Sequence, residues 1–215
     1  DIKLAKNESE AFQILFATTA ENKKVNVSVT DFKNSDGDTL KTEAFKANYS
    51  KVPGFGDKYN CEYADALIPV THTGDRGGPA ELKKGLQQAF FIRTHADKDA
   101  KAGEYTAVVT AVNENGDVIL EKEIKATVWD FTLPDAPANE SAFGNYSGTF
   151  YTLSNVKEGD DEARQKVFEQ TYELLLENRM SPYYIPYDIL DERADAYMSD
   201  ERLTSFVAPF PDDDE

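Results

Sequence analysis

Residues 103–134 decide the fold of the first part of the chain; they read GEYTAVVTAVNENGDVILEKEIKATVWDFTLP. Residues 105–112 are rich in β-branched side chains, and Asn115-Gly116 follows as a turn, because glycine tolerates a positive φ there. In the return segment, apolar side chains recur on one face, at Val118, Leu120, Ile124, Ala126 and Val128. This period of two predicts a long β-hairpin whose second strand has one buried and one exposed face.

Shorter segments with β-strand character precede this hairpin. Turn residues separate them, and residues 2–5 add a short edge strand. The expected strands are residues 9–18, 24–32, 44–52, 63–70 and 87–95. Several short strands with an apolar face are typical of two packed antiparallel sheets. We therefore predict a mainly β fold for residues 1–132, an immunoglobulin-like antiparallel β-sandwich.

Residues 34–38, with the sequence NSDGD, resemble the start of a calcium-binding loop. An EF-hand loop also needs a bidentate glutamate at its twelfth position, and this chain lacks one at that spacing. A plain Asp-Gly turn explains the same residues. We therefore predict no metal site here or elsewhere in the chain.

The sequence changes character after residue 132. Residues 133–141 contain Pro134 and Pro137 and are expected to form a linker. Acidic residues at 160–162 then open a helix that ends near residue 178, because acidic side chains favour a helix N-terminus. Short strands are expected within 142–153 and at 181–186 and 207–210, with a helix at 194–206. This alternation predicts the start of an α/β domain over residues 142–215.

Charge is distributed unevenly between these two parts. The chain has a net charge of −17; residues 1–132 carry 21 acidic and 17 basic side chains, and residues 133–215 carry 19 and 6. A nucleic-acid partner requires a basic surface, and so does binding to anionic lipid. We therefore expect neither partner. No stretch approaches the ~20 apolar residues of a membrane helix.

The sequence offers few candidates for a catalytic nucleophile or a metal ligand. Cys61 is the one cysteine, so no internal disulfide can form. The two histidines, His72 and His95, belong to no metal-binding or nucleophile motif, and the glycine-rich residues 53–59 lack a phosphate-binding pattern. The sequence predicts no cofactor.

Five segments carry a resemblance to a known family. They are KNESEAFQ at 6–13, YADALIP at 63–69, AGEY at 102–105 leading into VWDFTLP at 128–134, AFGN at 142–145, and YELLLENRMSP at 172–182. On these segments the chain resembles bacterial glycoside hydrolases. That family has an N-terminal β-sandwich followed by a (β/α)8 barrel, part of which is catalogued as a domain of unknown function. Where the family often has His-Arg before its second barrel strand, this chain has Asn178-Arg179.

The resemblance implies that residues 142–215 resemble the first units of a TIM barrel. Such a barrel needs ~250 residues, and only 83 follow residue 132. We therefore expect the chain to be the front portion of a longer, secreted or cell-surface protein, inactive by itself. Glycosidases use two carboxylates, which this family's barrel supplies from later strands, so the catalytic residues stay unknown.

The resemblance also suggests where sugar could bind. Active sites of such barrels lie at the carboxyl ends of the strands, and sugar rings stack on exposed aromatic side chains. The candidate substrate contacts are Asn145, Tyr184 and Tyr187. The alternative is that these aromatic side chains fill the barrel wall. Trp129 is expected to pack between the two parts of the chain.

Two further hypotheses stay open. The sandwich could be a non-catalytic module that binds carbohydrate or protein, or it could belong to an adhesion or scaffold protein. The partner predicted by the hydrolase hypothesis is a polysaccharide or oligosaccharide. Self-association through an uncovered barrel segment is a second consequence of that hypothesis.

Overall fold

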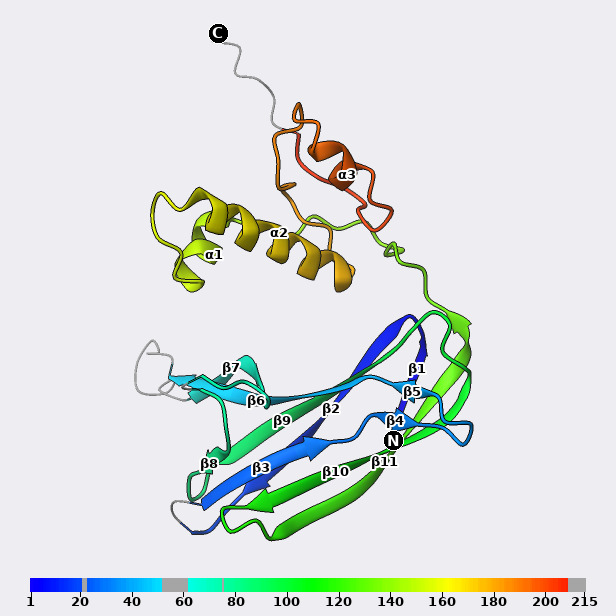
Figure 1. The fold of residues 1–215 in the computed structure, drawn as a ribbon, viewed down its shortest axis with the longest axis vertical. Helices are drawn as coiled ribbons and strands as arrows, with labels where there is room; N and C mark the ends of the chain where they lie inside the picture. The colour runs from blue at the N-terminus through cyan, green and yellow to red at the C-terminus, as the bar shows by residue number, and fades with distance from the viewer. Residues whose placement is uncertain (21–22, 52–61, 75, 209–215) are drawn as a thin grey trace. The chain divides into compact units, whose positions relative to one another are not determined.

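The computed structural model describes residues 1–20, 23–51, 62–74 and 76–208 (Figure 1). The chain divides into two compact units, Asp1–Leu133 and Pro134–Glu215. Cys61, the glycine-rich residues 53–59, Val52 at the end of one expected strand and part of the strand expected at 207–210 lie outside the described residues. Strands form the first unit and helices with irregular segments form the second, so the fold is mainly β.

Among the described residues, the strands of the first unit form two sheets. In chain order the strands are β1 (Ile2–Lys6), β2 (Glu8–Ala17), β3 (Lys23–Val29), β4 (Phe32–Lys33), β5 (Thr39–Leu40), β6 (Thr42–Lys51), β7 (Glu62–Pro69), β8 (Ala80–Leu82), β9 (Gln87–Ala96), β10 (Gly103–Asn113) and β11 (Val118–Thr132). The larger sheet has the order β1-β11-β10-β3-β8, with β4 beside β10 and β5 beside β4. The smaller sheet has the order β2-β9-β6-β7.

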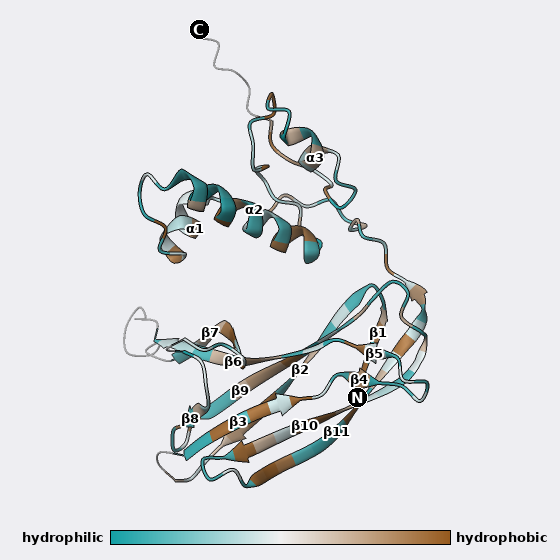
Figure 2. Cartoon of the chain, viewed as in Figure 1, coloured by the Kyte–Doolittle hydropathy of each residue, from teal (hydrophilic) through white to brown (hydrophobic). Residues whose placement is uncertain are grey.

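The hydrophobic core lies between these sheets, in a sandwich-like arrangement (Figure 1). Side chains of β3, β8 and β10 in the larger sheet meet those of β6 and β9 in the smaller one; the members of this cluster are Val25, Val27, Ala44, Ala80, Leu82, Phe90, Ile92, Val109 and Ala111. Figure 2 shows the hydrophobic positions along β3, β10 and β11. Burial of these side chains is the main force that holds the sheets together.

The hairpin predicted at residues 103–134 is confirmed. β10 and β11 pair antiparallel from Gly103↔Val128 to Val112↔Val118. On the predicted buried face Ala126 and Val128 are fully covered, whereas Val118 beside the turn is 58% exposed. The predicted face of β11 is therefore buried at Ala126 and Val128, away from the turn. At the turn end the same face is exposed, because the hairpin extends beyond the core.

The prediction of wholly antiparallel sheets is wrong at β1. This strand occupies an edge of the larger sheet, as expected, but it runs parallel to β11. Asn7 has a φ of 62° and its N–H donates to the carbonyl of Ala96 at 2.6 Å. The chain thus turns at Asn7, and β2 enters the other sheet, so β1 does not pair with its neighbour in sequence.

Two turns of the first unit have the same construction. In the hairpin turn, Asn113 Oδ1 accepts hydrogen bonds from the N–H groups of Asn115 and Asp117, and Gly116 has a φ of 87°. In the turn at 34–38, Asn34 Oδ1 accepts from the N–H groups of Asp36 and Asp38. The carboxylate of Asp38 bonds to the Asn34 amide and to Lys101, a fully protein-based set of partners.

The second unit contains three described helices: α1 (Ser147–Leu153), α2 (Asp161–Glu177) and α3 (Ala194–Met198). α2 matches the predicted helix. Its N-cap Asp160 accepts a hydrogen bond from the N–H of Ala163, and it ends where Arg179 adopts a φ of 56°. The cap bonds Arg179 N–H to Leu176 and Met180 N–H to Leu175 form a Schellman motif with arginine at a position usually taken by glycine.

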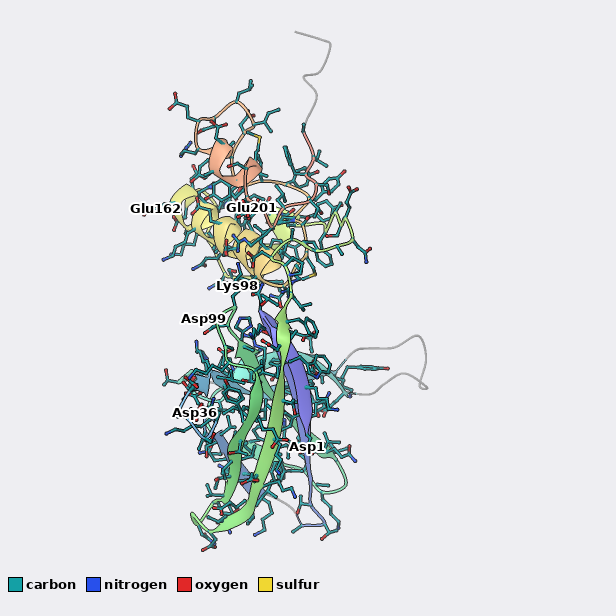
Figure 3. The ribbon with its side chains drawn as sticks, turned by 90° about the vertical axis from the view of Figure 1, so that its right-hand side faces the viewer. Asp1, Asp36, Lys98, Asp99, Glu162 and Glu201 are labelled. Atoms are coloured by element: carbon teal, nitrogen blue, oxygen red, sulfur yellow. The ribbon has the colours of Figure 1, made fainter. Side chains whose placement is uncertain are left out.

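Other predictions for the second unit need correction. Residues 147–153 are helical, the helix expected at 194–206 ends at Met198, and the strands expected at 142–153 and 181–186 shrink to one bridge between Phe143 and Pro182. Pro182 and Pro186 lack N–H groups, so a longer ladder cannot form there. Charged side chains such as Asp36 and Glu162 project from the two units into solvent (Figure 3).

Candidate functional site

Three extended segments of the second unit lie side by side and define the candidate site. Phe143 N–H donates to the carbonyl of Ser181 at 2.7 Å, and Tyr183 N–H donates to the carbonyl of Phe143 at 2.8 Å. These two bonds make the parallel bridge between Phe143 and Pro182. Val207 N–H then donates to the carbonyl of Tyr183 at 2.9 Å, which brings in the third segment.

Three hydroxyl groups tie these segments together at their amino ends. The hydroxyls of Ser181 and Thr204 lie 2.7 Å apart, Ser181 N–H donates to Ser141 Oγ at 3.0 Å, and Ser141 N–H donates to Thr204 Oγ1 at 3.2 Å. Ser181 is fully buried. Because Thr204 lies beside Ser181 and Val207 beside Tyr183, the third segment runs in the same direction as the second.

Asn145 lies at the carboxyl end of the first segment and is fully buried. Its Nδ2 donates to the carbonyl of Tyr184 at 2.8 Å, and its Oδ1 accepts from the N–H of Tyr184 at 2.8 Å. The side-chain amide thus takes the place of a backbone peptide and continues the pairing beyond the bridge. Both polar atoms of Asn145 are used by this contact.

Exposed aromatic rings surround the same carboxyl ends. Tyr146 is 63% exposed and Tyr184 39% exposed, and their ring centroids lie 6.3 Å apart. Tyr183 packs edge-on against Tyr184 at 4.9 Å. Adjacent, partly exposed tyrosine rings of this kind offer both an apolar face and a hydroxyl group to a ligand.

Tyr187 is directed elsewhere. Its hydroxyl donates to the carboxylate of Glu169 on α2, and the guanidinium of Arg193 lies 4.1 Å from its ring centroid. The hydrogen bond from Tyr187, together with one from Gln165, lowers the pKa of Glu169. The same hydrogen bond raises the pKa of Tyr187. The structure therefore brings Asn145 and Tyr184 into contact and places Tyr187 against α2.

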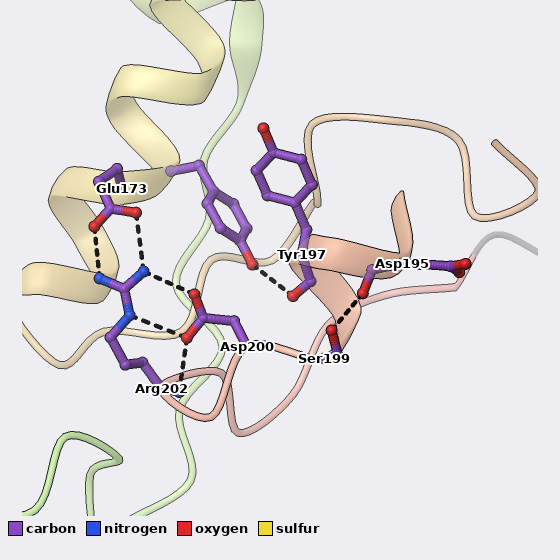
Figure 4. A network of polar contacts seen from close by, with 7 residues as sticks. Glu173, Asp195, Tyr197, Ser199, Asp200 and Arg202 are labelled. Atoms are coloured by element: carbon purple, nitrogen blue, oxygen red, sulfur yellow. Dashed lines mark hydrogen bonds and ion pairs between the residues drawn. The ribbon is translucent and has the colours of Figure 1, made fainter. Parts of the chain in front are cut away.

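A second polar network fixes α2 to the segment after α3 (Figure 4). The guanidinium of Arg202 donates to both carboxylate oxygens of Glu173, at 2.5 and 3.0 Å, and to both of Asp200, at 3.0 and 2.7 Å. Tyr172 donates its hydroxyl hydrogen to the carbonyl of Tyr197 at 3.2 Å, and burial raises the pKa of Tyr172. This network ties to α2 the segment that leads, two residues later, to Thr204 of the candidate site.

Asn178 stands where the resembled family often has histidine. It is the C-cap of α2, and its Nδ2 donates to the carbonyl of Leu174 at 2.8 Å. The next residue, Arg179, donates from Nε to the carbonyl of Pro134 at 3.2 Å. In this chain both residues therefore complete the end of the helix.

The first unit holds a pocket of about 860 Å³. It opens beside β6, β8 and β9, and its lining residues are Lys46, Ala47, Asn48, Tyr49, Glu62, Ala80, Glu81, Lys83, Gly85, Leu86, Gln87 and Gln88. Nothing in the sequence pattern marked this place, because its residues come from strands far apart in the chain.

Metal-binding clusters and membrane-spanning helices are both absent from the described residues. Within them, no group of three or more histidine, cysteine or acidic side chains is arranged to hold a metal ion. Within the same residues, no helix has the length and apolar character needed to cross a membrane.

No family model matches the chain, and no curated protein matches it in sequence. A solved structure shares its fold. This is a family 123 glycoside hydrolase from Clostridium perfringens, studied for the hydrolysis of glycolipid glycans, with a TM-score of 0.56 and 14% identity. The match covers 81% of this chain and 31% of the hydrolase, so this chain spans about a third of that protein.

Two other solved structures have lower scores. One is MyfA, the major subunit of Myf fimbriae from Yersinia enterocolitica, in complex with galactose, with a TM-score of 0.28, 16% identity and coverage of 54% and 78% of the two chains. The other is a mutant of the SrpA adhesin of Streptococcus sanguinis, with a TM-score of 0.32 and 13% identity. That match covers 66% of this chain and 64% of the adhesin. At these scores neither structure informs the function of this chain.

The sequence named two of the residues that the structure brings together here. It marked Asn145 and Tyr184, which the structure joins. It missed the hydroxyl groups of Ser141, Ser181 and Thr204, because isolated serine and threonine residues carry no signal. The sequence also gave no sign that Glu169 accepts a hydrogen bond from Tyr187.

Proposed function

We propose that this chain is the front portion of a glycoside hydrolase that degrades carbohydrate. In this proposal residues 1–132 are an immunoglobulin-like accessory sandwich, residues 133–141 are a linker, and residues 142–215 begin a (β/α)8 barrel. The supporting observation is the fold shared with the family 123 hydrolase over 81% of the chain. The first unit makes up less than two thirds of the chain, so a match of that extent includes residues of the second unit.

The arrangement of the second unit fits such a barrel. Its three extended segments are parallel and adjacent in chain order, and α2 connects the first to the second. A (β/α)8 barrel places consecutive parallel strands side by side in the same way, with a helix after each strand. Alternating strands and helices of this type require further units to cover their apolar faces.

Within this proposal, Tyr184 and its neighbour Tyr146 contact the sugar. Both rings are exposed at the carboxyl ends of the parallel segments, where barrel enzymes bind substrate. Asn145 acts by holding the backbone of Tyr184, since both its polar atoms are engaged there. Tyr187 packs against α2, where its hydroxyl donates to Glu169, and this proposal gives it no sugar contact.

The proposal assigns no catalytic residue within this chain. A retaining or inverting glycosidase needs two carboxylates on either side of the scissile bond. The carboxylate of Glu169 accepts hydrogen bonds from Tyr187 and Gln165, which lower its pKa. A general acid requires a raised pKa. The proposal places the protein outside the cell or on its surface, and it includes self-association through exposed apolar residues such as Leu153 and Leu190.

Two measurements on the protein purified from its native source test this function. Its intact mass should lie well above the 24.0 kDa of this chain, and it should hydrolyse at least one of a panel of p-nitrophenyl glycosides. Tyr184→Ala should lower kcat/KM at least about tenfold, whereas Tyr184→Phe, which keeps the ring, should stay near the wild type. A mass of 24.0 kDa would overturn the proposal.

The pocket of the first unit favours a second candidate function. The sandwich could be a non-catalytic module that binds carbohydrate or protein, with or without a barrel behind it. The pocket's volume of about 860 Å³ lies within the usual ~300–1,000 Å³ of ligand pockets, and its wall is rich in charged and amide side chains.

A further inference from the structure

The smaller sheet of the first unit is split between β6 and β9. The two strands pair from Thr42↔Thr94 to Lys46↔Phe90. Beyond Lys46, β6 continues to Lys51 paired with β7, and the remainder of β9, from Gln87 to Ala89, pairs with β2. A continuous sheet would have extended the β6–β9 ladder through these positions.

Side chains bridge the split where the ladder is missing. Gln88 Nε2 donates to the carbonyl of Ala47 at 2.9 Å, and the hydroxyl oxygen of Tyr49 accepts from the N–H of Ala89 at 3.2 Å. Backbone groups inside a protein need such partners. The opening is therefore stabilised by specific hydrogen bonds, and the pocket of about 860 Å³ lies at this position.

The pocket wall carries equal numbers of opposite charges. Lys46 and Lys83 face Glu62 and Glu81, and an ion pair of 3.6 Å joins Lys83, after β8 of the larger sheet, to Glu62 at the start of β7. A wall without net charge gives no preference to a phosphate or a polyanion, which need an excess of basic groups.

Lys46 is the most enclosed of these charged groups. Its ammonium group donates to the carbonyls of Gly77 and Gly78 at 3.3 and 3.2 Å, and burial lowers its pKa, against an opposing effect of Glu81. An ammonium group has three N–H donors, so one donor remains for a ligand.

The rest of the wall offers neutral polar groups and an apolar surface. The amides of Asn48 and Gln87 each present a donor and an acceptor, which suits neighbouring hydroxyl groups. Gln88 offers no donor, because its Nε2 donates to the carbonyls of Ala47 and Ala89. The ring of Tyr49 and the side chain of Leu86, which is 50% exposed, supply apolar contact for the C–H face of a sugar ring.

We propose that this pocket binds a short neutral oligosaccharide, with Lys46 and the amides of Asn48 and Gln87 as hydrogen-bond partners and Leu86 at the rim. The volume lies near the upper end of the usual ~300–1,000 Å³ for ligand pockets, which suits two or three sugar rings. The proposal rests on the second candidate function and is independent of the barrel. It places an accessory sugar site on the first unit, separate from Tyr184.

The test is an NMR titration of the full 215-residue chain, with backbone amides assigned. The probes are maltotriose, cellotriose, triacetylchitotriose and mannotriose, with trigalacturonic acid as a charged comparison. At least one neutral trisaccharide should shift the amides of residues 46–49 and 85–88 with saturation. The charged trisaccharide should bind no more tightly than the neutral ones, because the wall carries no excess of basic groups to attract it.

Two variants and one control make the result specific. Lys46→Met removes the donor with little change in volume, and Leu86→Asp alters an exposed rim residue that the fold does not need. Each should weaken binding at least about tenfold. Lys122→Met, on the exposed face of β11, should bind like the wild type.

Three outcomes would overturn the proposal. They are the absence of shifts at residues 46–49 and 85–88 with every neutral trisaccharide, wild-type affinity in both Lys46→Met and Leu86→Asp, and preferential binding of trigalacturonic acid. Shifts confined to Tyr146 and Tyr184 would overturn this site while supporting the sugar contacts of the second unit. The two proposals can therefore fail separately.

Discussion

The side chain of Asn145 and the backbone of Tyr184 form a reciprocal pair of hydrogen bonds, each 2.8 Å long, although the two residues lie 39 positions apart. This pair extends a parallel ladder that Pro182 and Pro186 would otherwise stop. It also fixes the chain at the base of the exposed Tyr184 ring. One buried amide therefore supports both the folding of the second unit and the position of a proposed ligand contact.

Replacing Asn145 should destabilise the second unit. Asn145→Ala leaves the N–H and carbonyl of Tyr184 without these partners, and we expect a loss of about 2–4 kcal/mol in the free energy of unfolding. Asn145→Asp keeps the acceptor but loses the donor and should also be destabilised. Denaturant unfolding and hydrogen exchange of the Tyr184 amide measure both effects. Unchanged protection of that amide in Asn145→Ala would contradict the assignment.

Arg202 should contribute to stability through its four contacts with Glu173 and Asp200. Its side chain is 29% exposed, so solvent screens these contacts only in part. We expect Arg202→Met to lower the free energy of unfolding by about 1 kcal/mol. The control is Lys166→Met on the exposed surface of α2, which should change it by less than about 0.5 kcal/mol. Equal losses in both variants would show that the network adds nothing.

Acid should destabilise the second unit. Hydrogen bonds from Tyr187 and Gln165 lower the pKa of Glu169, those from Arg202 lower the pKa of Asp200, and those from Arg193 lower the pKa of Asp191 to about 2. A carboxyl group with a lowered folded pKa adds stability above its unfolded pKa, here 3.8 to 4.5, and loses it as the pH falls through the folded value.

The free energy of unfolding should therefore be flat from neutral pH down to about pH 5 and then fall towards pH 2. Denaturant titrations followed by the circular dichroism of α2 measure this dependence. Arg202→Met should reduce the slope below pH 5, because Asp200 then loses the partner that lowers its pKa. Stability that increases on acidification would be inconsistent with these contacts.

The Asn-x-x-Gly-Asp turn of the β10–β11 hairpin provides a matched pair of substitutions. Asn113→Ala removes the acceptor for two N–H groups of the hairpin turn, and we expect a loss of about 1–2 kcal/mol in the free energy of unfolding of the first unit. Asn115→Ala, at an exposed position of the same turn, should cost less than about 0.5 kcal/mol. Fluorescence of Trp129 during denaturant unfolding reports on this unit. Equal effects of the two substitutions would contradict the role of Asn113.

The longer strands of the first unit followed from its sequence because each has its own pattern, whereas the short strands β4, β5 and β8 were not predicted. In β3, Val25 and Val27 are buried as the alternation predicts, and α2 begins at the acidic residues that favour a helix N-terminus. Such signals act within a few residues. The parallel pairing of β1 with β11 did not follow, because the turn at Asn7 sends neighbouring strands into different sheets.

In the candidate sites, too, local features could be predicted from the sequence and long-range contacts could not. Asn145 and Tyr184 could be named from their place near expected strand ends, but the sequence could not show that they bond to each other. The pocket at Lys46 depends on where the β6–β9 ladder stops and on the bridging side chains of Tyr49 and Gln88. These are long-range properties of the packed sheets, and no local pattern encodes them.

The parallel pair of β1 and β11 also determines the order in which the first unit is completed during synthesis. Lys6 and Asp130 form a 2.6 Å ion pair across 124 positions of sequence. A ribosome adding 5–20 residues per second needs roughly 6–25 s to cover that distance. The N-terminal strand therefore emerges first and must wait, while the β10–β11 hairpin can close as soon as it leaves the exit tunnel. A nascent chain stalled before residue 130 exposes the edge of an unfinished sheet to chaperones and to neighbouring chains.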